Sequence, residues 1–173
     1  MRFIVCLTIK KRRNFKGEAF FVRADGCELR MTVDKGEGVF ATRHFRVGET
    51  VMVGVIERRL AKNTAHASQV SRSEFVLLGG MGPKVNHSCD PNCGVRLNES
   101  GAYDLMARRI ITPGDEITFD YAMRNYSIEN FPSRCRCGSE ICRGSVTGWK
   151  DLPDERKVAY RGLIAPYLLE IDR

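Results

Sequence analysis

Three cysteines near the C-terminus have the spacing of metal ligands: Cys135-x-Cys137-x4-Cys142. Thiolates bind zinc well, and a structural zinc site holds its ion with four ligands in a tetrahedral arrangement. Three thiols cannot complete that arrangement, so a metal here needs a fourth ligand from another part of the chain. The alternative is that the three cysteines are reduced thiols without a metal.

A second group of polar side chains lies in the run Asn86-His87-Ser88-Cys89-Asp90-Pro91-Asn92. His87 could act as a metal ligand or as a general base. However, no partner carboxylate or second histidine lies at ligand spacing from it. Asn86 and His87 could instead form a buried pair whose polar atoms are hydrogen-bonded.

The third group is aromatic and lies in the segment Thr118-Phe119-Asp120-Tyr121. Residues i and i+2 of a β-strand point to the same face, so a strand here places the rings of Phe119 and Tyr121 side by side. The two rings could line a site or pack in the core. Asp120 faces the other way and is better suited to fixing a loop.

Short strands separated by turns are expected to position these groups. Apolar and β-branched runs between turn residues predict strands at residues 3–9, 19–22, 29–33, 38–41, 50–56, 74–78, 95–97, 103–108 and 117–119. Pro153 predicts the start of a helix through Tyr160, and Gly162 and Pro166 separate it from a second short helical segment at 166–171. The expected fold class is mostly β, with several small sheets and a helical C-terminal cap.

The composition is that of an ordinary globular protein. The chain has 173 residues, enough for one domain with its own core, and 43% are hydrophobic and 28% charged. No apolar run approaches the roughly 20 residues of a membrane-spanning helix, so no membrane is expected as a partner. Residues 3–9 are apolar, but Lys10-Lys11-Arg12-Arg13 follows them without a cleavage site, which favours a strand over a signal peptide. The sequence therefore predicts an intracellular protein.

The charge and cysteine content narrow the chemistry further. Seven cysteines in an intracellular chain favour metal binding or reactive thiols over disulfides. The net charge of +7 favours a polyanion or an acidic surface as partner, with a solvated basic surface as the alternative. Residues 10–13 could be a nuclear address or a nucleic-acid contact.

In this order and with these gaps, the motifs resemble the SET domain family of S-adenosylmethionine-dependent protein lysine methyltransferases. The match runs from about Gly36 to Val146. The resemblance implies a SET-domain fold of several small β-sheets with a pseudoknot, a post-SET zinc loop and a short helical C-terminus. It divides the chain into N-terminal strands packing on the core (1–34), the SET domain (35–125), the post-SET segment (126–148) and a helical cap (149–173). The layout is nearest to the compact, free-standing bacterial group.

The resemblance also assigns a site for S-adenosylmethionine. A glycine pair before a strand lets the backbone approach the methionine part of the cofactor, although a G-x-G string taken alone is more often a hairpin turn. An apolar residue after the last cysteine covers the adenine, here Val146, with Trp149 as a possible wider lid. The cofactor-binding residues that the resemblance implies are Gly36, Glu37, Gly38, Val39, Asn86, His87, Tyr121 and Val146.

Catalysis is assigned by resemblance to Tyr121, whose hydroxyl would lie beside the transferring methyl. Phe119 would line the lysine channel, and because it lacks a hydroxyl it leaves room for a second or third methyl. One feature departs from the family: the strand after Gly48-Glu49 carries no Glu-Tyr pair, so one wall of the channel is missing. Tyr103, Tyr126 or His66 could replace that wall.

The resemblance supplies the fourth zinc ligand as well. One structural Zn²⁺ would be held by Cys89, Cys135, Cys137 and Cys142, pinning the C-terminal segment over the cofactor. Cys93 is the competing fourth ligand.

The predicted function is methyl transfer from S-adenosylmethionine to a lysine of a protein, either a histone, a histone-like or other DNA-associated protein, or a ribosomal protein. The alternative is a catalytically weak or inactive zinc-stabilised SET module that binds chromatin or nucleic acid. The location would be cytoplasmic in a bacterium and nuclear in a eukaryote.

Overall fold

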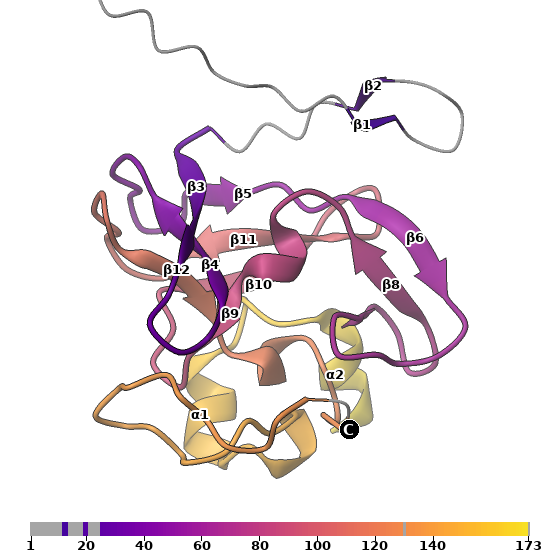
Figure 1. The fold of residues 1–173 in the computed structure, drawn as a ribbon. Coiled ribbons are helices and arrows are strands. Elements are labelled where there is room, and N and C mark those ends of the chain that lie inside the picture. The colour runs from indigo at the N-terminus through magenta and orange to yellow at the C-terminus, as the bar shows by residue number, and fades with distance from the viewer. Residues whose placement is uncertain (1–11, 14–18, 21–24, 130, 173) are drawn as a thin grey trace, which may run out of the picture.

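The computed structural model describes residues 12–13, 19–20, 25–129 and 131–172. Within them the chain forms short strands, three single 3-10 turns and two α-helices near the C-terminus (Figure 1). The strands are β1 (Arg12–Arg13), β2 (Ala19–Phe20), β3 (Cys27–Met31), β4 (Glu37–Ala41), β5 (Thr50–Met52), β6 (Ile56–Leu60), β7 (Ser68–Gln69), β8 (Phe75–Leu78), β9 (Asn86–His87), β10 (Cys93–Leu97), β11 (Tyr103–Ala107) and β12 (Glu116–Phe119). The helical elements are η1 (Gly82–Lys84), η2 (Tyr121–Met123), η3 (Trp149–Asp151), α1 (Asp154–Ala159) and α2 (Pro166–Ile171).

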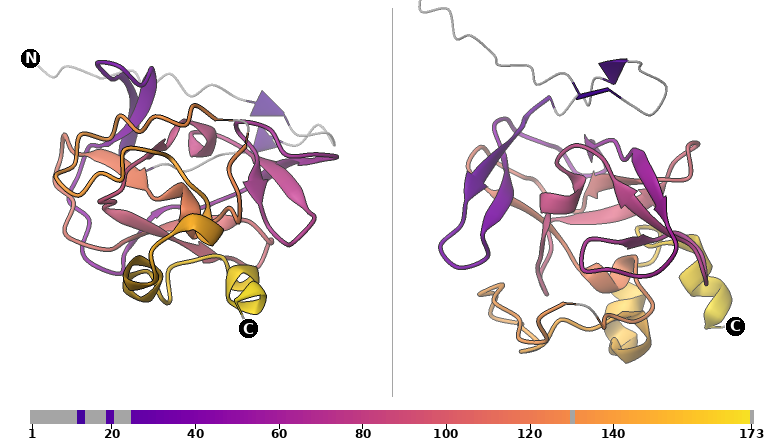
Figure 2. Two further views of the ribbon diagram at one scale, coloured as in Figure 1. Left: turned by 90° about the horizontal axis from the view of Figure 1, so that it is seen from below. Right: turned by 45° about the vertical axis from the view of Figure 1, so that its right-hand side comes forward.

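The largest sheet runs in the order β3-β4-β12-β10-β11-β5, and β9 pairs with β12 off that path. A smaller sheet has the order β6-β8-β7, and β1 pairs with β2. Helices α1 and α2 lie on one side of the strands (Figures 1 and 2). The mostly β architecture with small sheets and a short helical C-terminus is confirmed.

The main hydrophobic core lies between the large sheet and the C-terminal segment. From the sheet it takes residues such as Val39, Ile117 and Phe119, and from the C-terminal segment Tyr160 and Leu168. Because η3 buries Trp149 and α2 buries Tyr167 and Leu168, these short elements depend on packing against the rest of the chain for their stability. The C-terminal segment therefore packs in one core with β12 and with the residues that follow it.

The predicted helices are confirmed, and most predicted strands are found within one or two residues of their expected bounds. The predicted strand at 50–56 is too long: β5 ends at Met52, because the Gly54 N–H donates to Asp104 Oδ1 (3.0 Å) and the Gly54 carbonyl accepts from Asn98 Nδ2 (2.9 Å). Strands β1, β6, β7 and β9 were not predicted. The predicted strand at 3–9 lies outside the described residues.

Trp149 is not a lid over a pocket, contrary to the prediction. Its ring is 1% exposed and belongs to the main core, and its Nε1–H donates to Asp172 Oδ2 (2.7 Å). Among the described residues, none of the helices is long and apolar enough to cross a membrane.

Candidate active site

Strand β12 brings three of the sequence motifs to one place: the glycine turn, the Asn-His run and the aromatic segment. It pairs in parallel with β9, so that Thr118 lies opposite Asn86 and Phe119 opposite His87. It also pairs antiparallel with β4, where Ile117 lies opposite Val39. The glycine turn, the Asn-His run and the aromatic segment thus meet on one strand although they are far apart in the sequence.

The glycine turn leads into β4 with little space for side chains. Gly36 has a φ of +75°, in the left-handed region that favours glycine. At Gly38 a Cβ would lie 2.7 Å from Glu116 Oε1 and 3.0 Å from Asn86 Nδ2. A Cβ at position 38 would displace the ends of the Glu116 and Asn86 side chains, so glycine preserves their arrangement.

Asn86 ties that turn to β12. Its Nδ2 donates to the Glu37 carbonyl (3.1 Å) and to Glu116 Oε1 (2.8 Å), and Glu116 also forms an ion pair with Lys35. An adjoining polar cleft of about 450 Å³ has a lining that includes Lys35, Glu116 and Ser139. The glycine turn thus has the carboxylate of Glu116, the ammonium of Lys35 and the amide of Asn86 beside it. Such a set suits a ligand with an amino group and a carboxylate, as in an amino acid. Val39 itself is fully buried in the core.

His87 is buried and fixes the backbone of the catalytic candidate. Its Nδ1 accepts a hydrogen bond from the Tyr121 N–H (3.2 Å), and its Nε2 lies 3.4 Å from Cys89 Sγ. Burial lowers the pKa of His87 to about 4, so the imidazole is neutral at pH 7. A neutral histidine occupied in this way is better suited to positioning Tyr121 than to acting as a general base.

Tyr121 lies in an aromatic cluster. Its ring centroid is 5.0 Å from that of Phe119, 5.2 Å from His87 and 5.3 Å from Phe131. Its hydroxyl donates to the Val85 carbonyl (3.1 Å), and burial raises the pKa of that hydroxyl to about 12. Tyr121 therefore keeps its proton at neutral pH and offers a fixed O–H group.

Asp120 fixes the turn that carries Tyr121, as its position in the strand led us to expect. Its carboxylate is fully buried, accepts the Ala122 N–H (3.1 Å) and binds Arg143 through both guanidinium ends (2.6 and 3.0 Å). The Tyr160 hydroxyl donates to the same carboxylate (3.0 Å). Arg143, which the sequence did not single out, thereby links the C-terminal cysteine loop to the residue beside Tyr121.

The four predicted zinc ligands form a cluster. The sulfurs of Cys89, Cys135, Cys137 and Cys142 all lie within 4.8 Å of one another, and Cys89 Sγ is 3.8 Å from Cys135 Sγ. Tetrahedral zinc with Zn–S bonds of about 2.3 Å requires sulfurs about 3.8 Å apart, so this set fits a zinc ion. Cys93 is fully buried in β10 outside the cluster, so the alternative fourth ligand is wrong.

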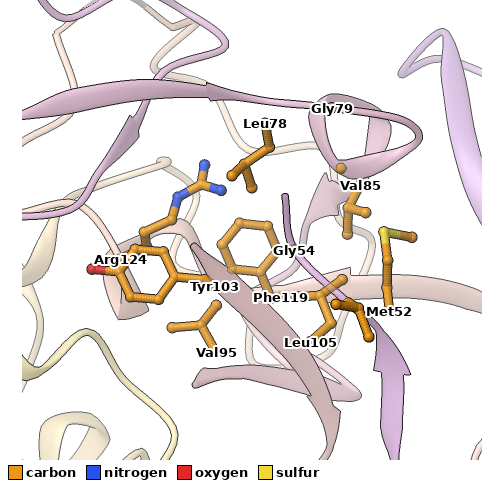
Figure 3. A pocket seen from close by; sticks show the side chains of 12 residues that line it. Met52, Gly54, Leu78, Gly79, Val85, Val95, Tyr103, Leu105, Phe119 and Arg124 are labelled. Atoms are coloured by element: carbon orange, nitrogen blue, oxygen red, sulfur yellow. The ribbon is translucent and has the colours of Figure 1, made fainter. Parts of the chain in front are cut away.

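A small cavity adjoins Phe119 where the missing tyrosine wall is expected (Figure 3). Tyr103 lines it, whereas Tyr126 does not, and His66 is exposed before β7. Gly54 also lines it, and a Cβ at this position would overlap the Tyr103 carbonyl. Of the three residues predicted to replace the wall, only Tyr103 is at the cavity.

Sequence reasoning missed two residues here. Arg124 lines the cavity with Phe119, and Phe131 packs edge-on against Tyr121. The position of Phe131, four residues before the first loop cysteine, was the only available signal for it. Val146 is buried, and its N–H donates to the Ser133 carbonyl (2.7 Å), which closes the base of the cysteine loop.

Comparisons with known proteins agree with this geometry. The SET domain family model matches residues 36–122. The chain is similar to histone-lysine N-methyltransferase ash1 of Drosophila melanogaster (34% identity, covering 83% of this chain and 7% of that protein). It is also similar to histone-lysine N-methyltransferase mes-4 of Caenorhabditis elegans (31% identity, 69% of this chain and 16% of that protein). The chain thus spans less than a fifth of the length of these two relatives.

Solved structures share the fold. KRYPTONITE in complex with mCHH DNA, an H3(1-15) peptide and SAH has a TM-score of 0.57 at 23% identity, covering 75% of this chain and 30% of that one. KRYPTONITE with mCHG DNA and SAH has a TM-score of 0.56 at 26% identity, covering 73% and 30%. Because the family model matches half of the chain and its motifs meet on β12, the chain belongs to the SET domain family.

Proposed function

We propose that this chain transfers methyl groups from S-adenosylmethionine to the side-chain amine of a lysine in a histone. The observation that carries the proposal is the junction on β12, where Asn86 and His87 lie beside Phe119 and Tyr121. The names of the relatives, histone-lysine N-methyltransferases, and the H3 peptide and SAH in the KRYPTONITE structure support it. Histone-like, other DNA-associated and ribosomal proteins remain further candidates for the substrate.

When bound, the cofactor supplies an electrophilic methyl on a sulfonium, and its sulfur keeps the electron pair of the broken bond. We assign its amino-acid end to the glycine turn at Gly36–Gly38 and to Asn86. Here the backbone carries no side chain at two positions, and the polar end of Asn86 lies beside it. His87 keeps the segment in place, and the zinc loop with Val146 closes over it. We also propose the division into a SET domain at 35–125 and a post-SET segment at 126–148.

The lysine must reach the methyl as a neutral amine, because only the free electron pair can attack. Deprotonating a lysine of pKa about 10.4 at pH 7 costs about 4.6 kcal/mol. Apolar walls such as Phe119 reduce that cost, because burial disfavours the ammonium form. The proton passes to solvent water before the amine attacks, and the amine gains a positive charge when its electron pair forms the bond to the methyl carbon.

Tyr121 acts in this scheme as a fixed polar group and not as a base. Its hydroxyl stays protonated, and the hydrogen bond to Val85 and the packing of three rings hold its oxygen in one place. Weak C–H···O contacts to that oxygen would orient the methyl. The larger gain comes from aligning two bound reactants, which can be worth about 7–11 kcal/mol.

The test is transfer of labelled methyl groups to a panel of histones and ribosomal proteins, with mass spectrometry to locate the modified lysine. We expect Tyr121→Phe to reduce transfer at least about 100-fold, as for the loss of one oriented polar group in a transition state, while calorimetry shows cofactor binding within a few-fold of the original. Tyr126→Phe removes a hydroxyl outside the cavity and serves as the matched control. Near-normal turnover by Tyr121→Phe contradicts the catalytic assignment.

The second candidate function is that of an inactive, zinc-stabilised SET module. Gly54 favours it, because the position lacks a tyrosine and has no room for one. The two functions differ in turnover and not in binding. Cofactor binding without transfer to any protein in the panel would support the module.

We further propose that the chain acts in the nucleus, where its histone substrates lie. The net charge of +7 suits contact with nucleic acid, and the KRYPTONITE structures contain DNA. The similar proteins named above come from an insect and a nematode, so they lend no support to a bacterial grouping.

A further inference from the structure

The cavity beside Phe119 holds an unpaired positive charge. Its volume is about 20 Å³, which is room for about one water molecule. Most of its walls are apolar, including Met52, Leu78, Val85 and Leu105 (Figure 3). The guanidinium of Arg124 is the exception, and this residue is 9% exposed.

Arg124 has unusually few partners for a buried arginine. Its Cζ lies 4.9 Å from the ring centroid of Phe119, and its Nη2 lies 3.5 Å from the Ala67 carbonyl. Its Nε has no hydrogen-bond partner, and neither does the Tyr103 hydroxyl. Within the described part of the chain, no carboxylate forms an ion pair with it. A buried charge without a counter-ion is costly, so a role in function is a reasonable explanation for its retention.

The groups that face Arg124 leave its charge uncompensated. They are the tyrosines of three elements: Tyr103 on β11, Tyr121 on η2 and Tyr167 on α2. Burial raises the pKa of all three hydroxyls, so they are neutral at physiological pH. Burial lowers the pKa of Arg124, but from so high a value that arginine stays charged at pH 7.

The position of this charge relates it to the lysine channel. Arg124 and Tyr121 both contact Phe119, and the Tyr121 hydroxyl binds the carbonyl of Val85, which lines the same cavity. A lysine that passes Phe119 toward Tyr121 would therefore be separated from the guanidinium by the apolar side chains that line this small cavity. In such a space like charges repel strongly, whereas a neutral amine meets no repulsion.

We propose that Arg124 selects the neutral form of the substrate lysine, by placing a positive charge beside the channel, over the ring of Phe119. The inference rests on the proposed function for its substrate class. In this role Arg124 is a positioning residue. Its electrostatic repulsion acts on the charged form of the amine, and Arg124 takes no part in bond making.

The first test is the pH profile of single-turnover methyl transfer. Removing the charge in Arg124→Met should raise the apparent pKa of the profile by about one unit, so that transfer at pH 7 falls about tenfold while the plateau at high pH is unchanged. Arg124→Gln, a second neutral variant, should shift the profile in the same direction as Arg124→Met. Arg43→Met is the control: its guanidinium stacks on Phe45 but is paired with Glu49.

The second test needs no turnover. Calorimetry in the presence of SAH compares a histone H3 tail peptide with one in which every lysine is replaced by norleucine, an uncharged side chain of similar shape. The original chain should prefer the norleucine peptide more strongly at pH 6 than at pH 9, and Arg124→Met should reduce the preference at pH 6 about tenfold. Arg124→Gln serves as a second neutral variant should the methionine variant fail to fold.

The outcomes separate the inference from the proposed function. A charge-dependent preference for norleucine without any methyl transfer would support the selection by Arg124 and overturn the enzyme. Methyl transfer with superimposed pH profiles and equal peptide preferences in Arg124→Met would support the enzyme and overturn the selection.

Discussion

Two arginines near Tyr121, the half-buried Arg143 and the buried Arg124, differ in their partners. Arg143 reaches the turn from the cysteine loop and forms a two-pronged ion pair with the fully buried Asp120. Arg124 lies over the ring of Phe119 and has no carboxylate partner within the residues described. The first arginine is thus paired with an opposite charge, and the second is buried without one.

The difference separates a structural role from an electrostatic one. Because Asp120 also binds Ala122 and Tyr160, Arg143 joins the turn that carries Tyr121, the cysteine loop and the end of α1 into one unit. Arg124 forms no comparable ion pair among the described residues, and its guanidinium lines an apolar cavity instead. Loss of the first arginine should therefore act on stability, and loss of the second on the chemistry of the amine.

The largest effect is expected from Arg143→Met. It leaves the Asp120 carboxylate buried without a counter-ion, which should lower the free energy of unfolding by about 3–5 kcal/mol in urea denaturation. The exposed pair between Arg109 and Asp90 gives the matched control, because Arg109→Met should cost less than about 1 kcal/mol. Equal losses in the two variants would contradict the structural role of the ion pair between Arg143 and Asp120.

An intermediate effect is expected from Cys137→Ser. This variant tests whether the ion pair between Arg143 and Asp120 depends on zinc binding by the cysteine loop. Removing one of four ligands should reduce zinc affinity by at least about 10–100-fold, the range already seen for lost outer partners, and should loosen Arg143 from Asp120. Zinc content by mass spectrometry and hydrogen exchange across residues 131–146 provide the measurements. Cys93→Ala, outside the cluster, should retain one zinc per chain; a metal-free original chain would remove the zinc assignment.

The smallest effect on stability is expected from Arg124→Met. The lost contact with Phe119 is worth about 0.5–2 kcal/mol, and relief of a buried unpaired charge offsets it, so unfolding should change by no more than about 1 kcal/mol. The same urea titration measures it. If the free energy of unfolding falls as much as in Arg143→Met, Arg124 is a structural residue and the two arginines have the same role.

Much of the site could be predicted because its parts are local in sequence. The cysteine spacing indicated a metal, and the two-residue spacing of Phe119 and Tyr121 placed both on one face of a strand. The short strand β9 and the course of the chain after Met52 could not be predicted, because β9 depends on its pairing with β12 and the end of β5 on distant Asn98 and Asp104 side chains.

The arginines show the same limit. Nothing in the sequence distinguishes Arg124 or Arg143 among 28 lysines and arginines, because burial and partners arise only from the fold. The choice between Cys89 and Cys93 likewise required the strands, since β10 carries Cys93 into the core. Trp149 was misread because an aromatic residue near a loop resembles a lid until the helices beneath it are placed.

The close approach of Gly54 to the Tyr103 backbone has a consequence for redesign of this site. A Cβ at position 54 would overlap the Tyr103 carbonyl oxygen, which is backbone of β11 and cannot rotate away as a side chain would. Any change from glycine at this position would therefore push β11 aside. A phenol cannot be introduced here by a single substitution, so engineering of the channel has to begin at other positions.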